Sequence, residues 1–330
     1  MPANESLSVD QFKDHAAAIE KEVGKVIVGQ AEVVRLVLTS ILAGGHMLLE
    51  GVPGLGKTML IRTLGEILKL EFSRIQFTPD LMPADIVGTE ILVDQAGVRE
   101  FRFKPGPIFA NLILADEINR ATPKTQSALL EAMQEHSVTV AEKTYTLDEP
   151  FFVMATQNPL EMEGTYPLPE AQLDRFLFKI NIAYPSASEL VEILNRTTAG
   201  DGRAVQSVVT GDEIIAMRIL ARQVPIASHV SDYAARLVVA SHPGSNQASP
   251  LVNKFVRYGS SPRGAQALVL GAKVFALLSN RFNVAFEDLH AVAHAALRHR
   301  LLLNFEALAE GIYPDQLIDE LLETVPQLDV

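Results

Sequence analysis

A glycine-rich loop between a short apolar run and a helical pattern is the feature that most limits how this chain can fold. The apolar run is His46–Glu50, and the helical pattern covers Met59–Leu68. The loop consists of Gly51, Val52, Pro53, Gly54, Leu55, Gly56, Lys57 and Thr58. It matches the P-loop pattern without a gap, after a strand and before a helix as that pattern requires. We therefore prefer a phosphate-binding loop to an ordinary glycine turn.

The residue types of this loop suggest how a phosphate chain is held. Glycines let backbone N–H groups turn inward around the β- and γ-phosphates, and the helix start adds its positive end. Lys57 supplies a cation, and the Thr58 hydroxyl can bind Mg²⁺. The guanine-reading sequence Asn-Lys-x-Asp does not occur, because Asn253-Lys254-Phe255-Val256 lacks the acid. ATP or ADP with Mg²⁺ is therefore the expected ligand.

A second apolar run, Leu112–Ala115, ends in the two acids Asp116 and Glu117. A buried parallel strand delivers such residues to the carboxyl edge of the sheet, where ligands bind in open α/β folds. We expect Asp116 to help hold Mg²⁺ and Glu117 to polarise the water that attacks the γ-phosphate. Alone, two acids at this place would more often cap the next helix. Together with the P-loop, they indicate nucleotide hydrolysis.

The rest of the chain predicts an α/β fold, a parallel sheet flanked by helices, followed by an all-helical part. Further strands are expected at residues 72–77, 111–115, 151–155 and 175–182, alternating with helices at 6–23, 31–42, 59–68 and 125–134. Past Pro185 the strand signal disappears, and helices are expected near residues 188–196, 212–223, 230–241, 262–279 and 286–303. The expected units are an N-terminal helix in 1–28, a nucleotide-binding domain in 29–197 and a helical lid domain in 198–330.

The segment Thr78–Pro107 separates two predicted core strands and contains four prolines, at positions 79, 83, 105 and 107. Alternating apolar residues at 90–93 and 101–103 predict a small hairpin within otherwise irregular structure. Insertions of this kind commonly face a partner or a pore. Whether this one contacts a substrate stays open at this point.

Composition favours a cytoplasmic protein that does not bind nucleic acid. The 28 Lys and Arg residues against 40 Asp and Glu give a formal charge of −12, which repels a polyanion. There is no cysteine, and the first residues lack the basic and apolar parts of a secretory signal. The longest apolar stretches, 36–50 and 265–279, are interrupted by polar residues or glycine, so we expect no direct membrane span.

Four further segments resemble motifs of AAA+ ATPases, and the match is closest to the MoxR family over residues 25 to 330. The segments are Asp116–Ala121, Ala155–Pro159, Leu168–Phe176 and Ser261–Gln266. The resemblance implies that Asn158 orients the attacking water as sensor 1, that Arg175 is the arginine finger, and that Arg263 is sensor 2 in the lid. It also implies a hexameric or similar homo-oligomeric ring and a hairpin near 137–147. The implied function is chaperone-like remodelling of a client protein, together with a partner that has a von Willebrand factor A domain.

The residues alone support these assignments unevenly. Ser261 and Pro262 form a helix start that places Arg263 at the positive end of a helix, which suits an anion. Asn158 precedes Pro159 and could equally form a turn, and Arg175 could form a surface pair with Asp174. An arginine finger would contribute about 10³- to 10⁵-fold in rate, so a lone subunit would be nearly inactive.

Several alternatives stay open. Arg120 could also act across a subunit interface. His290 and His294 share a helix face, but they lack the Glu of the zinc protease motif, and with His299 they are better explained as packed or solvated residues. The expected function is an ATP-hydrolysing motor; the alternatives are a nucleotide-gated scaffold with slow turnover, a metal-chelatase-type motor and, against the charge, a nucleic-acid translocase.

Overall fold

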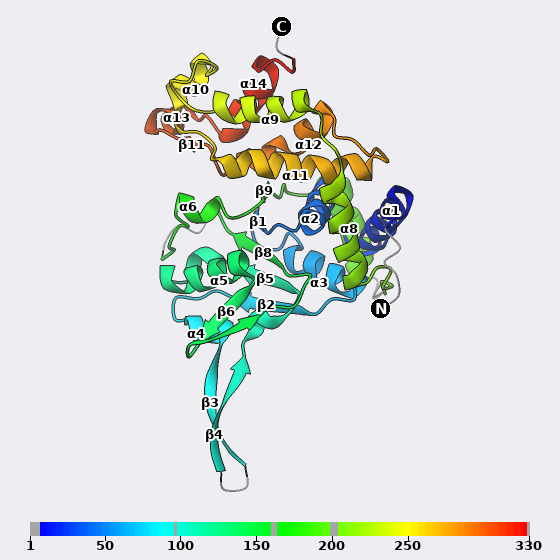
Figure 1. The fold of residues 1–330 in the computed structure, drawn as a ribbon, viewed down its shortest axis with the longest axis vertical. Coiled ribbons are helices and arrows are strands. Elements are labelled where there is room, and N and C mark those ends of the chain that lie inside the picture. Colours follow the sequence, from blue (N-terminus) through cyan, green and yellow to red (C-terminus); the bar gives the residue numbers. More distant parts are fainter. Residues whose placement is uncertain (1–6, 96–97, 160–163, 199–203, 329–330) are drawn as a thin grey trace.

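The computed structural model describes residues 7–95, 98–159, 164–198 and 204–328, which form an α/β part beneath a helical part (Figure 1). Residues 1–6 of the predicted N-terminal helical segment lie outside this range. So do residues 199–203, close to the predicted start of the lid domain. The division of the chain at residues 28 and 197 stays a prediction.

Five strands form the central sheet, in the order β2-β5-β8-β1-β9. They are β1 (Met47–Glu50), β2 (Phe72–Gln76), β5 (Leu112–Asp116), β8 (Phe152–Gln157) and β9 (Phe178–Asn181). Every neighbouring pair is parallel. The apolar runs form strands of this kind because a parallel sheet is buried on both faces. The predicted parallel α/β sheet is confirmed.

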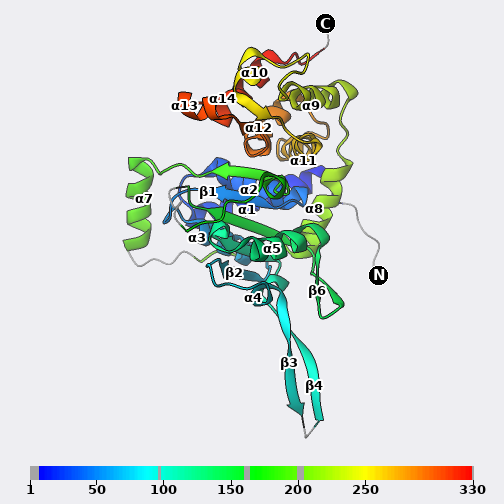
Figure 2. The same cartoon turned by 90° about the vertical axis from the view of Figure 1, so that its left-hand side faces the viewer.

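Alternate residues of the three central strands, β1, β5 and β8, enter two separate cores, one on each face of the sheet. Leu112 and Leu114 of β5 pack into one core, and Ile113 and Ala115 into the other. The first core also contains side chains of α1 (Val9–Val26), α2 (Ala31–Ala43) and α3 (Lys57–Ile67). The second contains side chains of α4 (Pro83–Val87) and α5 (Pro123–Glu135). Both faces are therefore covered, as Figure 2 shows from the side.

The segment between β2 and β5 contains a long antiparallel hairpin of β3 (Gly88–Gln95) and β4 (Val98–Pro105). The hairpin projects away from the rest of the molecule (Figures 1 and 2). The prediction of a small hairpin was wrong in extent, because each strand has eight residues. A close approach at its base explains where it starts: a Cβ at Gly88 would lie 2.3 Å from the carbonyl oxygen of Lys104.

A second hairpin, β6 (Ser137–Val140) and β7 (Lys143–Thr146), lies before β8. It confirms the hairpin that the family resemblance implied. Two 3₁₀ turns, η1 (Pro107–Phe109) and η2 (Ile118–Arg120), flank β5, and the short helix α6 (Glu170–Leu173) precedes β9. Arg175 lies in the turn between α6 and β9, so its prediction as a strand residue was wrong.

The C-terminal part is mainly helical, as predicted, but contains two short strands that were not. Its elements are α7 (Ala187–Thr198), α8 (Gly211–Gln223), α9 (Ser228–Ala240), α10 (Pro250–Phe255), β10 (Val256–Tyr258), α11 (Pro262–Leu278), α12 (Phe286–Leu297), β11 (Leu302–Leu303), α13 (Phe305–Glu310) and α14 (Pro314–Thr324). The helix predicted over 286–303 ends at Leu297, and Leu302 and Leu303 pair with β10. Strands of two and three residues are too short to give a recognisable alternation.

The helical part packs directly on the sheet. Gly271 of α11 lies against the Phe178 ring, and Arg298 donates a hydrogen bond to the carbonyl oxygen of Lys179 at 3.1 Å. From α8, Arg218 donates to the carbonyl oxygen of Ile41 at 2.8 Å. Within the described residues, no helix combines the length and the apolar character needed to cross a bilayer.

A buried histidine just before β1 joins this strand to α5 and β8. The His46 ring lies 2.9 Å from the carbonyl oxygen of Met133 through Nε2, and its Nδ1 accepts the Val153 N–H at 3.0 Å. These partners require a neutral ring with its hydrogen on Nε2. Burial lowers the pKa of His46 to about 4.

Because the pKa of His46 is about 4 in the folded chain and 6.5 when exposed, acid should favour unfolding. The contribution of the neutral His46 ring to the free energy of unfolding is complete above pH 6.5. It decreases as the pH falls towards 4, by up to about 3 kcal/mol. We expect the stability advantage of the wild type over His46→Gln to shrink by about 1.4 kcal/mol per pH unit below pH 6.5. Urea unfolding of both proteins between pH 7.5 and 5 measures this, and a constant difference would contradict it.

Candidate nucleotide-binding site

The predicted P-loop residues surround a cavity of about 560 Å³ at the carboxyl edge of the sheet. Gly54 and Gly56 have φ angles of 87° and 78°, in the left-handed region that favours glycine. Gly56 then precedes the first residue of α3, so the loop ends at a helix N-terminus. The residues that line the cavity are Pro53, Gly54, Gly56, Lys57, Thr58, Met59, Arg62, Arg74, Asp116, Glu117 and Asn158.

Lys57 begins α3 and folds back over the loop. Its Nζ donates a hydrogen bond to the carbonyl oxygen of Gly51 at 2.6 Å. Burial lowers the pKa of Lys57, and the nearby Asp116 and Glu117 carboxylates raise it. The cation is therefore held by the loop itself and faces the two acids across the cavity.

The two acids lie where β5 ends, and β8 fixes them there. The Thr156 hydroxyl donates to Asp116 Oδ1 at 2.6 Å and accepts the Glu117 N–H at 2.9 Å. Glu117 has a φ of 56°, which turns the chain out of the strand. A single buried hydroxyl thus sets the positions of both acids. Asn158 follows β8 at the same edge and also lines the cavity. Eight of the predicted residues therefore come together there: Pro53, Gly54, Gly56, Lys57, Thr58, Asp116, Glu117 and Asn158.

Strand β2 contributes two side chains that the sequence did not reveal. Arg74 donates to Asp116 Oδ2 at 2.6 Å, and Gln76 donates to Glu117 Oε2 at 2.8 Å. Arg74 also donates to Gln76 Oε1 at 2.6 Å. The signal available was two polar residues two positions apart on a predicted strand, which places both on one face. Arg120 pairs with Glu117 Oε2 at 2.9 Å within this chain.

A second hollow of about 330 Å³ adjoins the other side of the loop. Val52 and Leu55 of the loop line it, with Ile182 and the exposed Tyr184 after β9. Gln30 lies next to it and donates to the carbonyl oxygen of Leu55 at 3.4 Å. The sequence analysis placed no function on Gln30, Ile182 or Tyr184, because no motif marks them.

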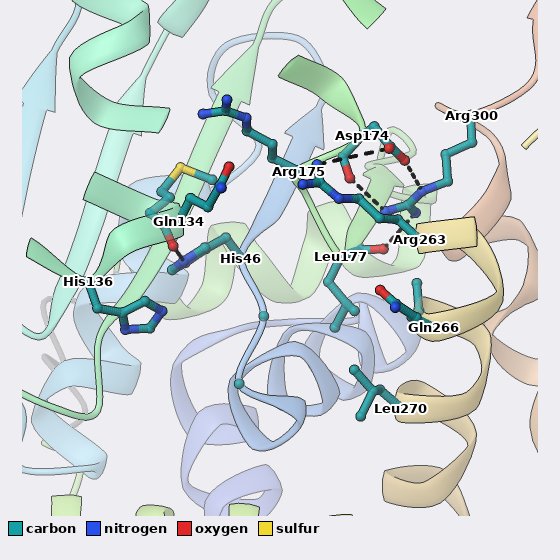
Figure 3. A pocket seen from close by; sticks show the side chains of 14 residues that line it. His46, Gln134, His136, Asp174, Arg175, Leu177, Arg263, Gln266, Leu270 and Arg300 are labelled. Carbon is teal, nitrogen blue, oxygen red and sulfur yellow. Dashed lines mark hydrogen bonds and ion pairs between the residues drawn. The ribbon is translucent and has the colours of Figure 1, made fainter. Parts of the chain in front are cut away.

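Arg175 and Arg263 lie in a different cavity, of about 240 Å³, at the opposite edge of the sheet (Figure 3). Arg175 donates to the carbonyl oxygen of Leu130 at 3.0 Å, and Arg263 lies 4.0 Å from Asp174. Neither arginine lines the P-loop cavity. Ser261 caps α11 by accepting the Arg263 N–H at 3.1 Å, so the predicted helix start is confirmed.

The three histidines have protein partners. His290 contacts the Tyr233 hydroxyl at 2.9 Å, His294 contacts Asp319 at 2.8 Å, and His299 contacts the carbonyl oxygen of Phe176 at 3.0 Å. Among the described residues, no group of three or more His, Cys, Asp or Glu side chains is arranged to hold a metal.

Comparison with known proteins agrees with this geometry. The profile of the ATPase family associated with various cellular activities (AAA) matches residues 46–178, and the AAA lid domain profile matches residues 249–321. Chaperone MoxR1 of Mycobacterium tuberculosis is 45% identical over 310 residues, which cover 93% of this chain and 81% of the relative. Protein MoxR of Methylorubrum extorquens is 32% identical over 96% of both chains.

A crystal structure of a Cytophaga hutchinsonii protein, described as a candidate ATPase, superposes with a TM-score of 0.90. It is 42% identical and the match covers 96% of both chains. The fold, the lid and the identity to proteins named MoxR all agree. The chain therefore belongs to the MoxR family of AAA+ ATPases.

Proposed function

We propose that this chain hydrolyses ATP at a site shared between two subunits of a homo-oligomeric ring, and uses the hydrolysis to remodel a partner protein. The observation that carries the proposal is the separation of the predicted residues into two groups. Lys57, Thr58, Asp116, Glu117 and Asn158 line one cavity, whereas Arg175 and Arg263 line another. Each group is half of a phosphoryl-transfer site.

The P-loop cavity supplies the binding half. Backbone N–H groups of residues 51–58, other than Pro53, and the N-terminus of α3 face the β- and γ-phosphates, and Lys57 adds its charge. The adenine base occupies the hollow beside Val52, Leu55 and Tyr184, which offers the apolar surface that a base needs.

The same cavity contains oxygen donors suited to Mg²⁺. Asp116 and the Thr58 hydroxyl both line it, and a magnesium ion in such sites takes only one or two protein ligands beside phosphate oxygens and water. The small number of protein donors therefore fits the ion. When bound, Mg²⁺ neutralises charge that develops on the phosphates.

Glu117 is the residue placed to polarise the attacking water. Its carboxylate is held at Oε2 by Gln76 and Arg120, and its backbone by Thr156. Asn158, 6% exposed at the end of β8, orients the same water. Arg74 holds the Asp116 carboxylate from the other side.

Arg175 and Arg263 serve the nucleotide of a neighbouring subunit. Arg175 precedes β9, whereas the P-loop follows β1, and these strands pair in parallel from Met47 and Phe178 onward. The four residues of β1 separate the two edges by about 13 Å. One chain therefore keeps its own arginines away from its own phosphates, and a ring, hexameric as in the family resemblance, brings the two edges together.

Remodelling of a client is supported by relatives and by shape. One relative is named a chaperone. The hairpin β3–β4 is joined through residues 77–87, which include α4, to β2, which holds Arg74 and Gln76 beside the two acids. A force on the hairpin would thus be transmitted to the hydrolysis site. We place a von Willebrand factor A domain protein among the partners, as the family resemblance implies.

The shared site predicts complementation between two inactive variants. Glu117→Gln should bind ATP without hydrolysing it, and Arg175→Ala should lose about 10³- to 10⁵-fold in rate. Mixed rings bring the intact arginine of one subunit to the intact Glu117 of the next, so mixing should partly restore phosphate release. If mixed rings form but remain inactive, the site is not shared.

The Thr156 hydroxyl should matter for hydrolysis more than for binding. Thr156→Val removes the hydrogen bonds to Asp116 and Glu117, and we expect the hydrolysis rate to fall about 10- to 100-fold, as for loss of a charged hydrogen bond. The dissociation constant for ATP should change little. Thr39→Val is the matched control, because Thr39 is equally buried and, among the residues that the structure describes, its hydroxyl bonds only to the Arg35 carbonyl oxygen. Equal losses in both variants would contradict the assignment.

A further inference from the structure

Arg300, three residues after the end of α12, has a side chain that is only 3% exposed. Its Nε donates to Asp174 Oδ1 at 2.8 Å. Its two terminal nitrogens donate to four backbone carbonyl oxygens, those of Asp174, Phe176, Leu177 and Ala296. A guanidinium has five N–H donors, and all five have an acceptor here.

The acceptors of Arg300 lie on both sides of Arg175. The carbonyl oxygen of Asp174 is 3.1 Å from the guanidinium, and that of Phe176 is 2.7 Å away. Arg175 itself lies in a turn, before the ladder of β9 begins. The hydrogen bonds from Arg300 therefore fix the backbone carbonyl groups of this turn, as hydrogen bonds from a neighbouring strand fix those of a strand residue.

Asp174 extends the same network to Arg263. Its two carboxylate oxygens each accept from the Ser261 hydroxyl at 2.9 Å, and Ser261 caps the helix that begins beside Arg263. Arg263 lies 4.0 Å from the same carboxylate. Figure 3 shows Arg263 and Arg300 beside Asp174, while the Arg175 side chain extends away from them.

We propose that Arg300 is a positioning residue that, through Asp174, fixes the separation of Arg175 and Arg263, so that both arginines meet the neighbouring subunit's phosphates together. Arg300 lines the same cavity, but its side chain is only 3% exposed and its five donors already have protein acceptors, so we assign it no contact with nucleotide. The inference rests on the shared site proposed above. The contacts between the sheet and the lid would thus hold the Arg175 and Arg263 side chains at a fixed distance from each other.

The test uses Arg300→Met, which keeps the length of the side chain and removes its donors. A misplacement of about 1 Å at a reacting centre costs about 10²-fold in rate, so we expect a loss of that order in ring hydrolysis. The variant's own P-loop cavity is untouched, and its dissociation constant for ATP should stay within about twofold. A purely structural defect would not separate the two quantities.

Mixed rings give the decisive readout. Arg300→Met mixed with Glu117→Gln should regain hydrolysis, because the Glu117→Gln subunit presents intact arginines to an intact site. Arg300→Met mixed with Arg175→Ala should stay inactive, because neither subunit presents a working pair. Two results would overturn the proposal. One is recovery when Arg300→Met is mixed with Arg175→Ala. The other is no recovery when Arg300→Met is mixed with Glu117→Gln, although Arg175→Ala mixed with Glu117→Gln does recover. If Glu117→Gln and Arg175→Ala do not complement each other, the shared site is itself rejected, and the role of Arg300 is rejected with it.

Arg298→Met is the matched control. Arg298 also joins the lid to the sheet, through the Lys179 carbonyl oxygen, and it pairs with Asp315 at 2.9 Å without contacting Asp174. We expect it to lower the melting temperature but to keep hydrolysis within a few fold. If Arg300→Met does not assemble, Ser261→Ala, which removes the hydroxyl that donates to both carboxylate oxygens of Asp174, should show a smaller loss with the same complementation pattern. An equal loss of hydrolysis in Arg298→Met would also overturn the proposal.

Discussion

The parallel pairing of β5 with β8 is the constraint on which the candidate site depends. Its register sets Ala115 opposite Ala155, so Asp116 and Thr156 lie side by side near the carboxyl ends of the two strands. One buried hydroxyl can then bond to both the Asp116 carboxylate and the Glu117 backbone. Because both strands are almost entirely buried, neither can shift without exposing apolar side chains to water. The core therefore determines the geometry of the acids.

The two ends of the parallel strands carry different groups of candidate site residues. Residues that follow the strands collect around the phosphate cavity, and residues that precede β1 and β9 collect around the arginines. This polarity follows from having all strands parallel, since an antiparallel neighbour would mix the two kinds of ends. This layout suits the proposed head-to-tail ring, because the two groups of residues lie at different surfaces of one subunit.

The sequence predicted those parts of the site that local spacing defines. Residues 51–58 and the pair Asp116 and Glu117 follow apolar runs directly, so their place at a sheet edge could be inferred. Arg74 and Gln76 could not, because their role depends on which strand lies beside β5. Arg300 is harder still, since four of its five acceptors are backbone carbonyl oxygens, which leave no residue pattern. Asn158 and Arg263 depended on the family resemblance as much as on their own surroundings.

The projecting hairpin has a consequence for the free subunit. In the described part of the chain, β3 and β4 pair only with each other, so each has an outer edge of unpaired backbone groups. Leu92 and Phe101 are 55% and 71% exposed along it. Such edges invite pairing with other chains, and charged side chains are the usual deterrent. The hairpin carries charged side chains at Glu90, Glu100, Arg102 and Lys104. These charges disfavour edge-to-edge pairing of isolated subunits into fibres, while the apolar side chains stay exposed.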